Sequence, residues 1–306
     1  MTQINTRAAH TAATARLSDL SRQLDDTQAQ ISRARRIDTP ADDPVAYARA
    51  ATLHREQASS AATQRGIDAA NRRLTSTDTA LESITDLVQR GRELALQGNN
   101  AALSVDDRQT LANELTELEA QLRTLADSRD SDGDRLFAGA RGDRPAYGVD
   151  AAGITVWQGG GRAPALTLGS SSVASGLEGP DGFGVTDTTT GTRDVFAAFS
   201  ALRAALLEPD PDLRAAGMQT GIADFDGHIT RLADARGSLG ARLGRLEAES
   251  DRIAKQNLAT ESDLAKLESL DMPEAIARLQ RLITVIEAAQ ASFVKVSSLS
   301  LWDQLR

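Results

Sequence analysis

A heptad pattern between residues 271 and 305 restricts the fold of this chain more than any other feature. Apolar residues there recur at alternating intervals of three and four, the spacing of a helix that lies along another helix. The seam consists of Ile276, Leu279, Ile283, Ile286, Gln290, Phe293 and Ser297. Asp271 supplies an acidic N-cap, Pro273 falls in the first turn and Glu274 completes a capping pattern. We therefore predict a helix from about residue 271 to residue 297, roughly 40 Å long.

This seam needs a partner, and the opposite end of the sequence provides one. A second heptad run consists of Leu17, Leu20, Leu24, Thr27, Ile31 and Ala34. Two such stripes of apolar residues bury each other when their helices pair. We predict a terminal coiled-coil domain made of residues 1–37 and 270–306. Its predicted assembly and packing residues are Leu17, Leu20, Leu24, Ile31, Ile276, Leu279, Ile283, Ile286 and Phe293.

A proline-rich segment follows the first helix and predicts a joint between domains at residues 37–44. Thr39, Pro40 and Asp42 resemble a capping box with proline at the first helical position, so we expect a new helix to start there. Asp43 and Pro44 continue this helix-start signal. The predicted joint residues are Thr39, Pro40, Asp42, Asp43 and Pro44.

Residues 38–140 and 194–269 predict a helical rod domain. Large apolar residues recur every seven positions from Ile67 to Val88, and leucines from 111 to 125 alternate at four and three. The polar break at residues 98–100 and a capping pattern at Ser104 separate two helices, which predicts an antiparallel hairpin. A further helix begins at Asp194, and another long seam runs from Ile222 to Ile253. That seam can pack against the hairpin.

Residues 141–193 are rich in Gly, Ser and Thr and predict a small β-rich insertion, which we expect at the end of the rod away from the termini. Short β-type runs occur at 147–149, 154–157, 165–168 and 183–185, and the glycines at 159–161 suggest a hairpin turn. Just before the insertion, residues 130–134 contain three aspartates. Their spacing does not match the calcium loop of an EF-hand, so a solvated turn is the better interpretation.

Composition excludes several classes of protein. The chain has 306 residues, of which 41% are hydrophobic and only 3% aromatic, which favours slender helical packing over a large core. A formal net charge of -9 argues against nucleic-acid binding. There is no cysteine, and no apolar run is long enough to insert into a membrane. The first residues lack the features of a secretory signal, so composition alone favours the cytosol.

No pattern in the sequence indicates an enzyme or a cofactor site. The three histidines, His10, His54 and His228, are far apart and have no metal-ligand spacing, so we expect them to be surface or packing residues. A nucleophile elbow and a phosphate-binding loop are both missing. The glycine run at 159–161 matches neither nucleotide-binding pattern.

Several segments resemble the flagellin superfamily. They are the run Thr39-Pro40-Ala41-Asp42-Asp43-Pro44, residues 136–139 and 144–147, residues 237–243, and residues 288–305. Within the family, the proline-aspartate run and the ending Leu-Ser-Leu-Trp-Asp at 299–303 are more similar to hook–filament junction proteins than to filament flagellins. Trp302 and Gln304 depart from the pattern, where phenylalanine and tyrosine are expected. The resemblance adds Leu299 and Leu301 to the predicted packing residues.

The resemblance implies a mainly α fold: an elongated, out-and-back coiled-coil and helical rod formed by both termini, with a small β-rich inserted outer domain. It implies a structural, non-enzymatic component of the bacterial flagellum, exported through the flagellar type III apparatus without a cleaved signal peptide and located outside the cell. It also implies terminal helices that order on assembly. The implied partners are further copies of the chain, hook-associated protein 1, flagellin and an export chaperone, with no cofactor.

Two alternatives remain at this point. The runner-up is a filament flagellin, which shares the fold and the out-and-back arrangement. The other is a cytosolic coiled-coil scaffold, or an enzyme housed in the insertion. An insertion enzyme would need a constellation such as His-Glu-x-x-His, and residues 140–193 contain no histidine.

Overall fold

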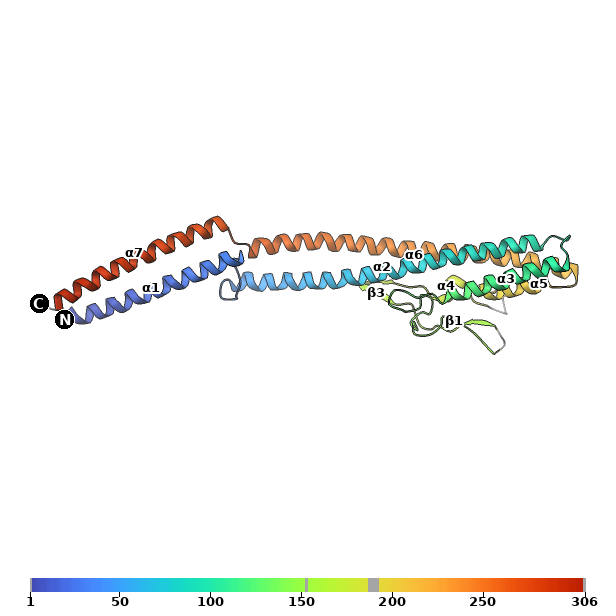
Figure 1. The fold of residues 1–306 in the computed structure, drawn as a ribbon, viewed down its shortest axis with the longest axis horizontal. Helices are drawn as coiled ribbons and strands as arrows, with labels where there is room; N and C mark the ends of the chain where they lie inside the picture. Colours follow the sequence, from blue (N-terminus) through green and yellow to red (C-terminus); the bar gives the residue numbers. More distant parts are fainter. Residues whose placement is uncertain (1, 152–153, 187–192, 305–306) are drawn as a thin grey trace. The chain divides into compact units, whose positions relative to one another are not determined.

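The chain is mainly helical, with four short strands between its third and fourth helices (Figure 1). The computed structural model describes residues 2–151, 154–186 and 193–304; near the chain ends it describes the side chains of residue 8 and of residues 10 to 295. The elements in chain order are α1 (Thr2–Arg33), α2 (Pro44–Gly98), α3 (Val105–Ala126), β1 (Tyr147–Val149), β2 (Thr155–Trp157), β3 (Ala165–Leu168), β4 (Ser171–Ala174), α4 (Gly179–Phe183), α5 (Val195–Leu206), α6 (Pro211–Glu268) and α7 (Met272–Gln304). The predicted class, helical with a small β insertion, is confirmed.

The chain divides into two compact units, and the first one joins the two ends of the sequence. We call Met1–Ser60 with Ala254–Arg306 the terminal unit, and Ala61–Ile253 the middle unit. Helices α2 and α6 each contribute residues to both. The domain boundaries predicted after residues 37, 140, 193 and 269 stay predictions.

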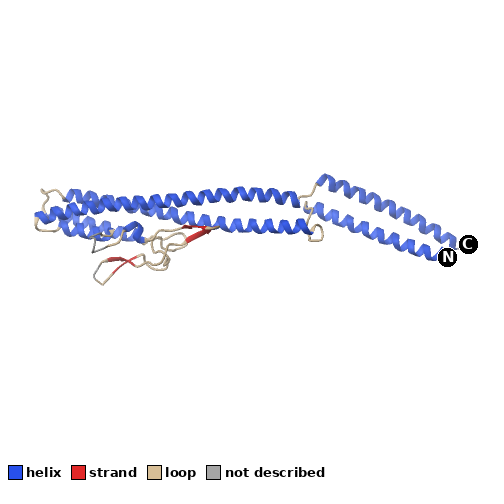
Figure 2. Cartoon of the chain, turned by 180° about the vertical axis from the view of Figure 1, so that it is seen from behind, coloured by secondary structure: helices blue, strands red, loops and turns tan. Residues whose placement is uncertain are grey.

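In the terminal unit, α1 and α7 lie side by side, and both chain ends are at the same end of this pair (Figures 1 and 2). The predicted pairing of the two termini is therefore confirmed. Asp271 caps α7 as expected, because its carboxylate accepts a hydrogen bond of 3.1 Å from the Glu274 amide. Helix α1 ends at Arg33, and Ala34 directly after it has a φ of 53°. The amides of Ala34 and Arg35 donate to carbonyls three and five residues back, the pattern of a Schellman motif.

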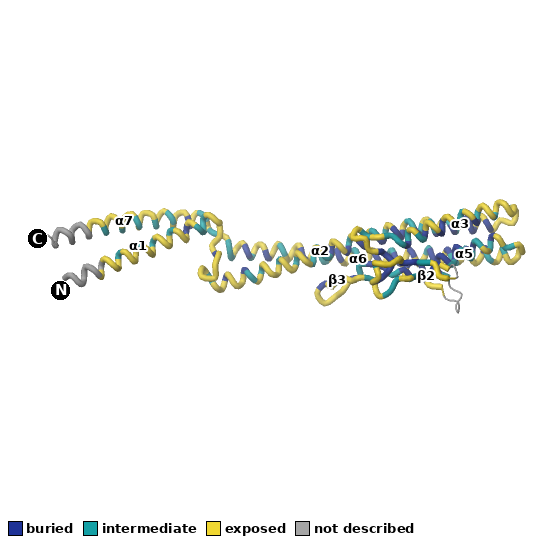
Figure 3. Tube along the Cα trace, turned by 60° about the horizontal axis from the view of Figure 1, so that its bottom comes forward, coloured by how far each residue is buried: buried dark blue, intermediate teal, exposed yellow. Residues whose placement is uncertain are grey.

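The middle unit contains the large apolar core. The predicted hairpin of α2 and α3 is confirmed, and Ser104 and Asp107 form the expected capping box at its second helix. The heptad residues of α2 and α6 point into the core, which is densest where α3 and α5 join them (Figure 3). The largest fully buried side chains are Phe137, Phe183, Phe196, Phe199, Phe225, Ile67, Leu74, Leu81, Ile84, Leu94, Leu115 and Leu122.

The insertion differs from its prediction in three details. The strands pair as two antiparallel ribbons, β1 with β2 and β3 with β4. The strand predicted at 183–185 is wrong, because Phe183 ends α4; strand β4 was not predicted. The glycines at 159–161 are not a hairpin turn. They connect the two ribbons, and Gly160 forms a parallel bridge with Gly139.

The insertion lies along the flank of α2 and α6 within the middle unit rather than at its end. Leu166 of β3 packs against α2 at Gly66, where an added Cβ would lie 2.8 Å from the leucine side chain. The Arg242 guanidinium of α6 donates a hydrogen bond of 2.6 Å to the Gly176 carbonyl. The expectation that the insertion occupies the far end of the rod is therefore wrong. Instead, the insertion packs against the helices through buried apolar residues such as Leu168, Val173 and Leu177.

Candidate assembly surface

The seam of α1 is only half-buried against α7. Leu17, Leu20, Leu24 and Ile31 each keep an intermediate exposure. Thr27 is the buried member of this seam, and its hydroxyl donates a hydrogen bond of 2.7 Å to the Gln23 carbonyl. The predicted N-terminal residues thus lie on the pairing face, but the pair alone does not cover them.

The pairing face of α7 is rotated from the predicted one. Its less exposed residues are Ala275, Leu279, Leu282, Ile286, Ala289 and Phe293. The Phe293 ring packs edge-on against His10 of α1, with ring centroids 4.6 Å apart. Ile276 and Ile283 lie on the flank of this face and remain 43% and 39% exposed. Apolar residues occur at both 275 and 276, and at both 282 and 283, so the spacing alone does not decide which member faces α1.

Much of the apolar surface of this helix pair remains exposed to solvent. Among the described side chains of α1 and α7, only Thr27 and Ala275 are buried. A fully buried leucine or isoleucine contributes roughly 1.5–3 kcal/mol, and a half-buried one correspondingly less. Among the described side chains of α7, the exposed large apolar residues are Ile276, Ile283, Val285 and Val294. At about 100° per residue, Ile276, Ile283 and Val294 follow one flank of the helix, and we call these three residues the α7 ridge. Val285 lies on the opposite flank. The side chains of the predicted packing residues Leu299 and Leu301 lie outside the part of the chain that is described.

Backbone and side-chain bonds tie the two connections of the terminal unit together. The Arg36 amide donates to the Glu268 carbonyl at 2.7 Å, and the Arg36 guanidinium donates to the Leu267 carbonyl at 2.8 Å. The Glu268 carboxylate lies 2.8 Å from His54 Nε2 and 3.5 Å from the Arg35 guanidinium. These contacts link the end of α1 and the start of α2 to the end of α6.

The predicted joint residues form a turn followed by a helix cap. The Asp42 carboxylate accepts from the Asp38 and Thr39 amides at 2.9 and 2.8 Å, and these bonds lower the pKa of Asp42. Asp43 caps α2 by accepting from the Ala46 amide at 3.0 Å, and Pro44 is the first helical residue. The prediction that the helix starts at Pro40 is therefore wrong. The Asp42 carboxylate does accept from the Thr39 amide, as a capping box requires, but only a turn follows and the helix begins at Pro44.

The charge of the chain is divided unequally between its units. The terminal unit has 14 acidic and 14 basic residues, so its formal charge is zero. The formal net charge of -9 therefore belongs to the middle unit. Close packing of many copies through the terminal unit would consequently bring together surfaces without net charge, which avoids like-charge repulsion.

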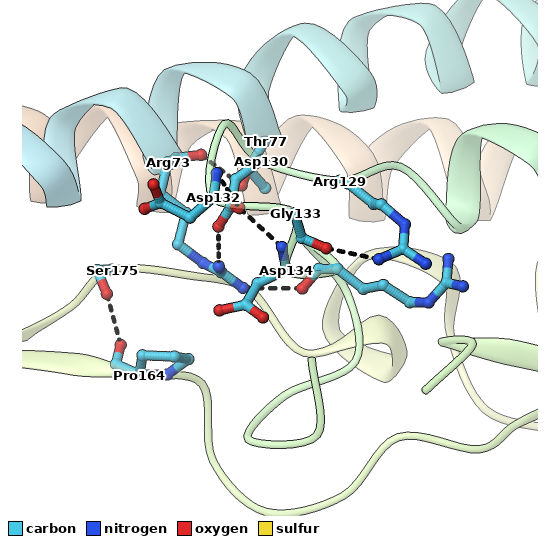
Figure 4. Close-up of polar contacts among 10 residues, drawn as sticks. Arg73, Thr77, Arg129, Asp130, Asp132, Gly133, Asp134, Pro164 and Ser175 are labelled. Carbon is cyan, nitrogen blue, oxygen red and sulfur yellow. Dashed lines mark hydrogen bonds and ion pairs between the residues drawn. The ribbon is translucent and has the colours of Figure 1, made fainter. Parts of the chain in front are cut away.

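A buried ion pair in the middle unit was missed by the sequence analysis (Figure 4). The Arg73 guanidinium of α2 pairs with the Asp130 carboxylate, and the two side chains are 10% and 8% exposed. Asp130 also accepts from the amides of Asp132 and Asp134 at 3.0 and 2.9 Å. Residues 130–134 do form the predicted turn, but Asp130 is not solvated. Its sequence surroundings resemble a polar loop and give no signal of an arginine 57 positions earlier.

Within the described residues, no three His, Asp or Glu side chains gather in a way that could hold a metal ion. The described helices also include none long and apolar enough to cross a membrane. The candidate site is a packing surface, because apolar residues of the α1–α7 seam are only half-buried and those of the α7 ridge are exposed.

Comparison with known proteins agrees with this description. Residues 4–141 match the family profile "Bacterial flagellin N-terminal helical region", and residues 222–303 match "Bacterial flagellin C-terminal helical region". The Escherichia coli (strain K12) flagellar hook-associated protein 3 is 23% identical over 292 residues, which cover 90% of each chain. A Listeria monocytogenes flagellin is 25% identical over 269 residues, covering 83% of this chain and 82% of that protein.

A solved structure shares the fold as well. The putative flagellar hook-associated protein from Vibrio parahaemolyticus superposes with a TM-score of 0.68 at 22% identity, over 74% of this chain and all of that one. The fold thus defines a class of structural proteins in which the two ends of the chain pair as long helices. The matched profiles lie at these two ends and together span more than half of the residues, so the chain belongs to the bacterial flagellin family.

Proposed function

We propose that this protein is a structural axial component of the bacterial flagellum that forms the junction between hook and filament. The observation that carries this proposal is the similarity to hook-associated protein 3, which extends over nine-tenths of both chains. Two sequence motifs independently favour a junction protein over a filament flagellin. They are the run at residues 39–44 and the ending at residues 299–303.

The packing of the terminal helices supports a role in assembly. The α1–α7 seam is half-buried and the α7 ridge is exposed, so stacking with other copies would remove further apolar surface from water. We propose that stacking uses the predicted residues Leu17, Leu20, Leu24, Ile31, Ile276, Leu279, Ile283, Ile286, Phe293, Leu299 and Leu301. The joint residues Thr39, Pro40, Asp42, Asp43 and Pro44 would fix where the terminal pair ends.

The proposal implies particular partners and a location. The protein would contact further copies of itself, hook-associated protein 1 on the hook side and flagellin on the filament side. A flagellar export chaperone would hold it before export. Its working location would be outside the cell, in the flagellum. The mechanical task would be to connect two tubes of different stiffness through a short zone of shared helical packing.

A second function, that of a filament flagellin, has support of its own. The Listeria flagellin is similar at a comparable identity and over most of its length. Both functions use the same fold and the same pairing of termini, so their difference is one of position in the flagellum.

Deleting the gene in its motile host separates the two functions. A junction protein predicts cells that carry hooks without attached filaments and that shed unpolymerised flagellin into the medium. The proposal fails if filaments persist on the deletion strain. It also fails if the major filament subunit disappears from cells and medium alike, which is the result expected of a flagellin.

A further inference from the structure

His228 is a buried titratable residue that the assembly surface does not use. It lies on α6 in the middle unit, 5% exposed, and its Nδ1 has no hydrogen-bond partner among the described atoms. Gly184, the first residue after α4, lies beside the ring. A Cβ built on Gly184 would be 3.4 Å from His228 Cε1, and Gly184 has a φ of 81° that favours glycine.

The segment over His228 is fastened by one carboxylate. Asp194, the N-cap of α5, accepts a hydrogen bond of 2.7 Å from the Thr186 hydroxyl and one of 2.8 Å from the Ala197 amide. The Thr186 hydroxyl in turn accepts from the Asp194 amide at 3.1 Å. We call residues 184–186 with Asp194 the clasp. Contact with α6 comes from Gly184 beside His228 and from the ion pair of 2.8 Å between Arg193, the neighbour of Asp194, and Asp224.

The groups around His228 act on an imidazolium ion in both directions, and a backbone hydrogen bond with Arg193 is one of those that favour it. On α6 itself lie Arg231, which opposes a positive charge, and Asp224, which favours one. From the start of α5, Asp194 also favours it. However, Asp224 already pairs with Arg193 at 2.8 Å, and Asp194 is engaged in the clasp. Burial is the largest influence, and it lowers the pKa of His228 below its ordinary value of 6.5.

We propose that His228 makes the clasp acid-sensitive: the neutral ring packs against Gly184, and protonation of the ring releases residues 184–186 from α6. The proton comes from solvent and binds the Nδ1 lone pair, which leaves an N–H without an acceptor and a positive charge beside Arg231. Release of residues 184–186 lets water solvate the unpaired N–H group and the positive charge. No other covalent bond forms or breaks.

The direction of the pH dependence follows from linkage. Above pH 6.5 the ring is neutral in both the closed and the released form, so the clasp is fully stable. As the pH falls below 6.5, the released form takes up a proton before the closed form does. The opening equilibrium should then rise by up to about tenfold per pH unit, until the closed form is protonated too.

Hydrogen–deuterium exchange of the full chain at about pH 7.5 and about pH 5.5, corrected for the chemical exchange rate, tests this proposal. We expect increased opening of peptides spanning residues 178–198 at the lower pH, by up to about tenfold for the unit below 6.5, with α3 as an internal reference. His54→Gln is the matched control, because His54 is exposed and bonded to Glu268, and it should respond like the wild type. His228→Gln, whose amide cannot be charged, should lose the response.

The proposal is overturned if His228→Gln keeps the wild-type pH response, or if the wild type shows none. If His228→Gln does not fold, NMR titration of the His228 ring in the wild type decides the question. A pKa below 6.5 supports the proposal, and a value at or above 6.5 overturns it.

Discussion

Replacing Asp130 by alanine would leave the Arg73 guanidinium buried in the middle unit without its counter-ion. The two side chains are 10% and 8% exposed, so water cannot take the place of the lost carboxylate without opening the structure. Removing one partner of a buried ion pair typically costs about 3–5 kcal/mol. The amides of Asp132 and Asp134 lose their acceptor as well, and we expect a total loss near the upper end of this range.

Urea unfolding followed by the fluorescence of Trp157 measures this loss. The Trp157 indole donates a hydrogen bond of 3.0 Å to the Phe137 carbonyl, so its emission reports on the middle unit. A Trp302→Phe background makes it the sole tryptophan. The matched control is Asp226→Ala, which breaks an ion pair with Arg92 whose side chains are 52% and 37% exposed. An exposed pair contributes about 0–1 kcal/mol, and we expect no larger cost there.

A double variant distinguishes a stranded charge from general damage. Arg73→Met together with Asp130→Ala removes both charges, so it should be less destabilised than Asp130→Ala alone. If Asp130→Ala costs no more than the exposed control, the pair is not buried as described. If the double variant is the less stable one, the cost of the single variant does not come from an unpaired arginine.

Three further predictions concern the backbone and one carboxylate. Ala34→Gly relieves the left-handed conformation at the end of α1 and should stabilise the terminal unit by up to about 1 kcal/mol in thermal unfolding; an unchanged or lower melting temperature contradicts this. Gly91→Ala places a Cβ 2.7 Å from the Phe225 ring and should destabilise the protein by about 1 kcal/mol or more. In the control Gly240→Ala, the added Cβ meets no atom within 4 Å, so this variant should stabilise the protein by about 0.5–1 kcal/mol. Equal effects of the two variants would refute the packing at Gly91. Because backbone N–H groups lower the pKa of Asp42 from 3.8, its contribution is present above pH 3.8 and lost as the pH falls. The melting temperature of Asp42→Asn should therefore fall less than that of the wild type between about pH 5 and about pH 3, and parallel curves would refute this.

Periodicity predicts the helices of this protein well, because each long seam has one dominant apolar stripe. In α2 and α6 the residues at spacing seven are the buried ones, from Ile67 to Val88 and from Phe225 to Ile253. In α7 the same reasoning correctly places Leu279, Ile286 and Phe293 on the less exposed face. It also selects Ile276 and Ile283, although Ala275 and Leu282 beside them are the less exposed residues. The tertiary packing decides which side of α7 faces α1, and the apolar pattern of α7 alone does not reveal that side.

Local sequence signals give wrong predictions where contacts between distant residues determine the structure. The proline at position 40 looks like a helix start, but Asp42 bonds inside the turn and the cap moves to Asp43. Asp130 looks like a solvated loop residue because its partner, Arg73, lies on another element. Phe183 looks like part of a strand, yet it is fully buried as the last residue of a short helix, where it packs against Phe137 and Tyr147.

The position of the protein in an intact flagellum tests the central claim most directly. Immunogold labelling with an antibody against the insertion, followed by electron microscopy of wild-type cells, would show this position. The account predicts label confined to a short zone where the hook meets the filament. Label distributed along the whole filament would contradict it and identify the chain as a filament subunit.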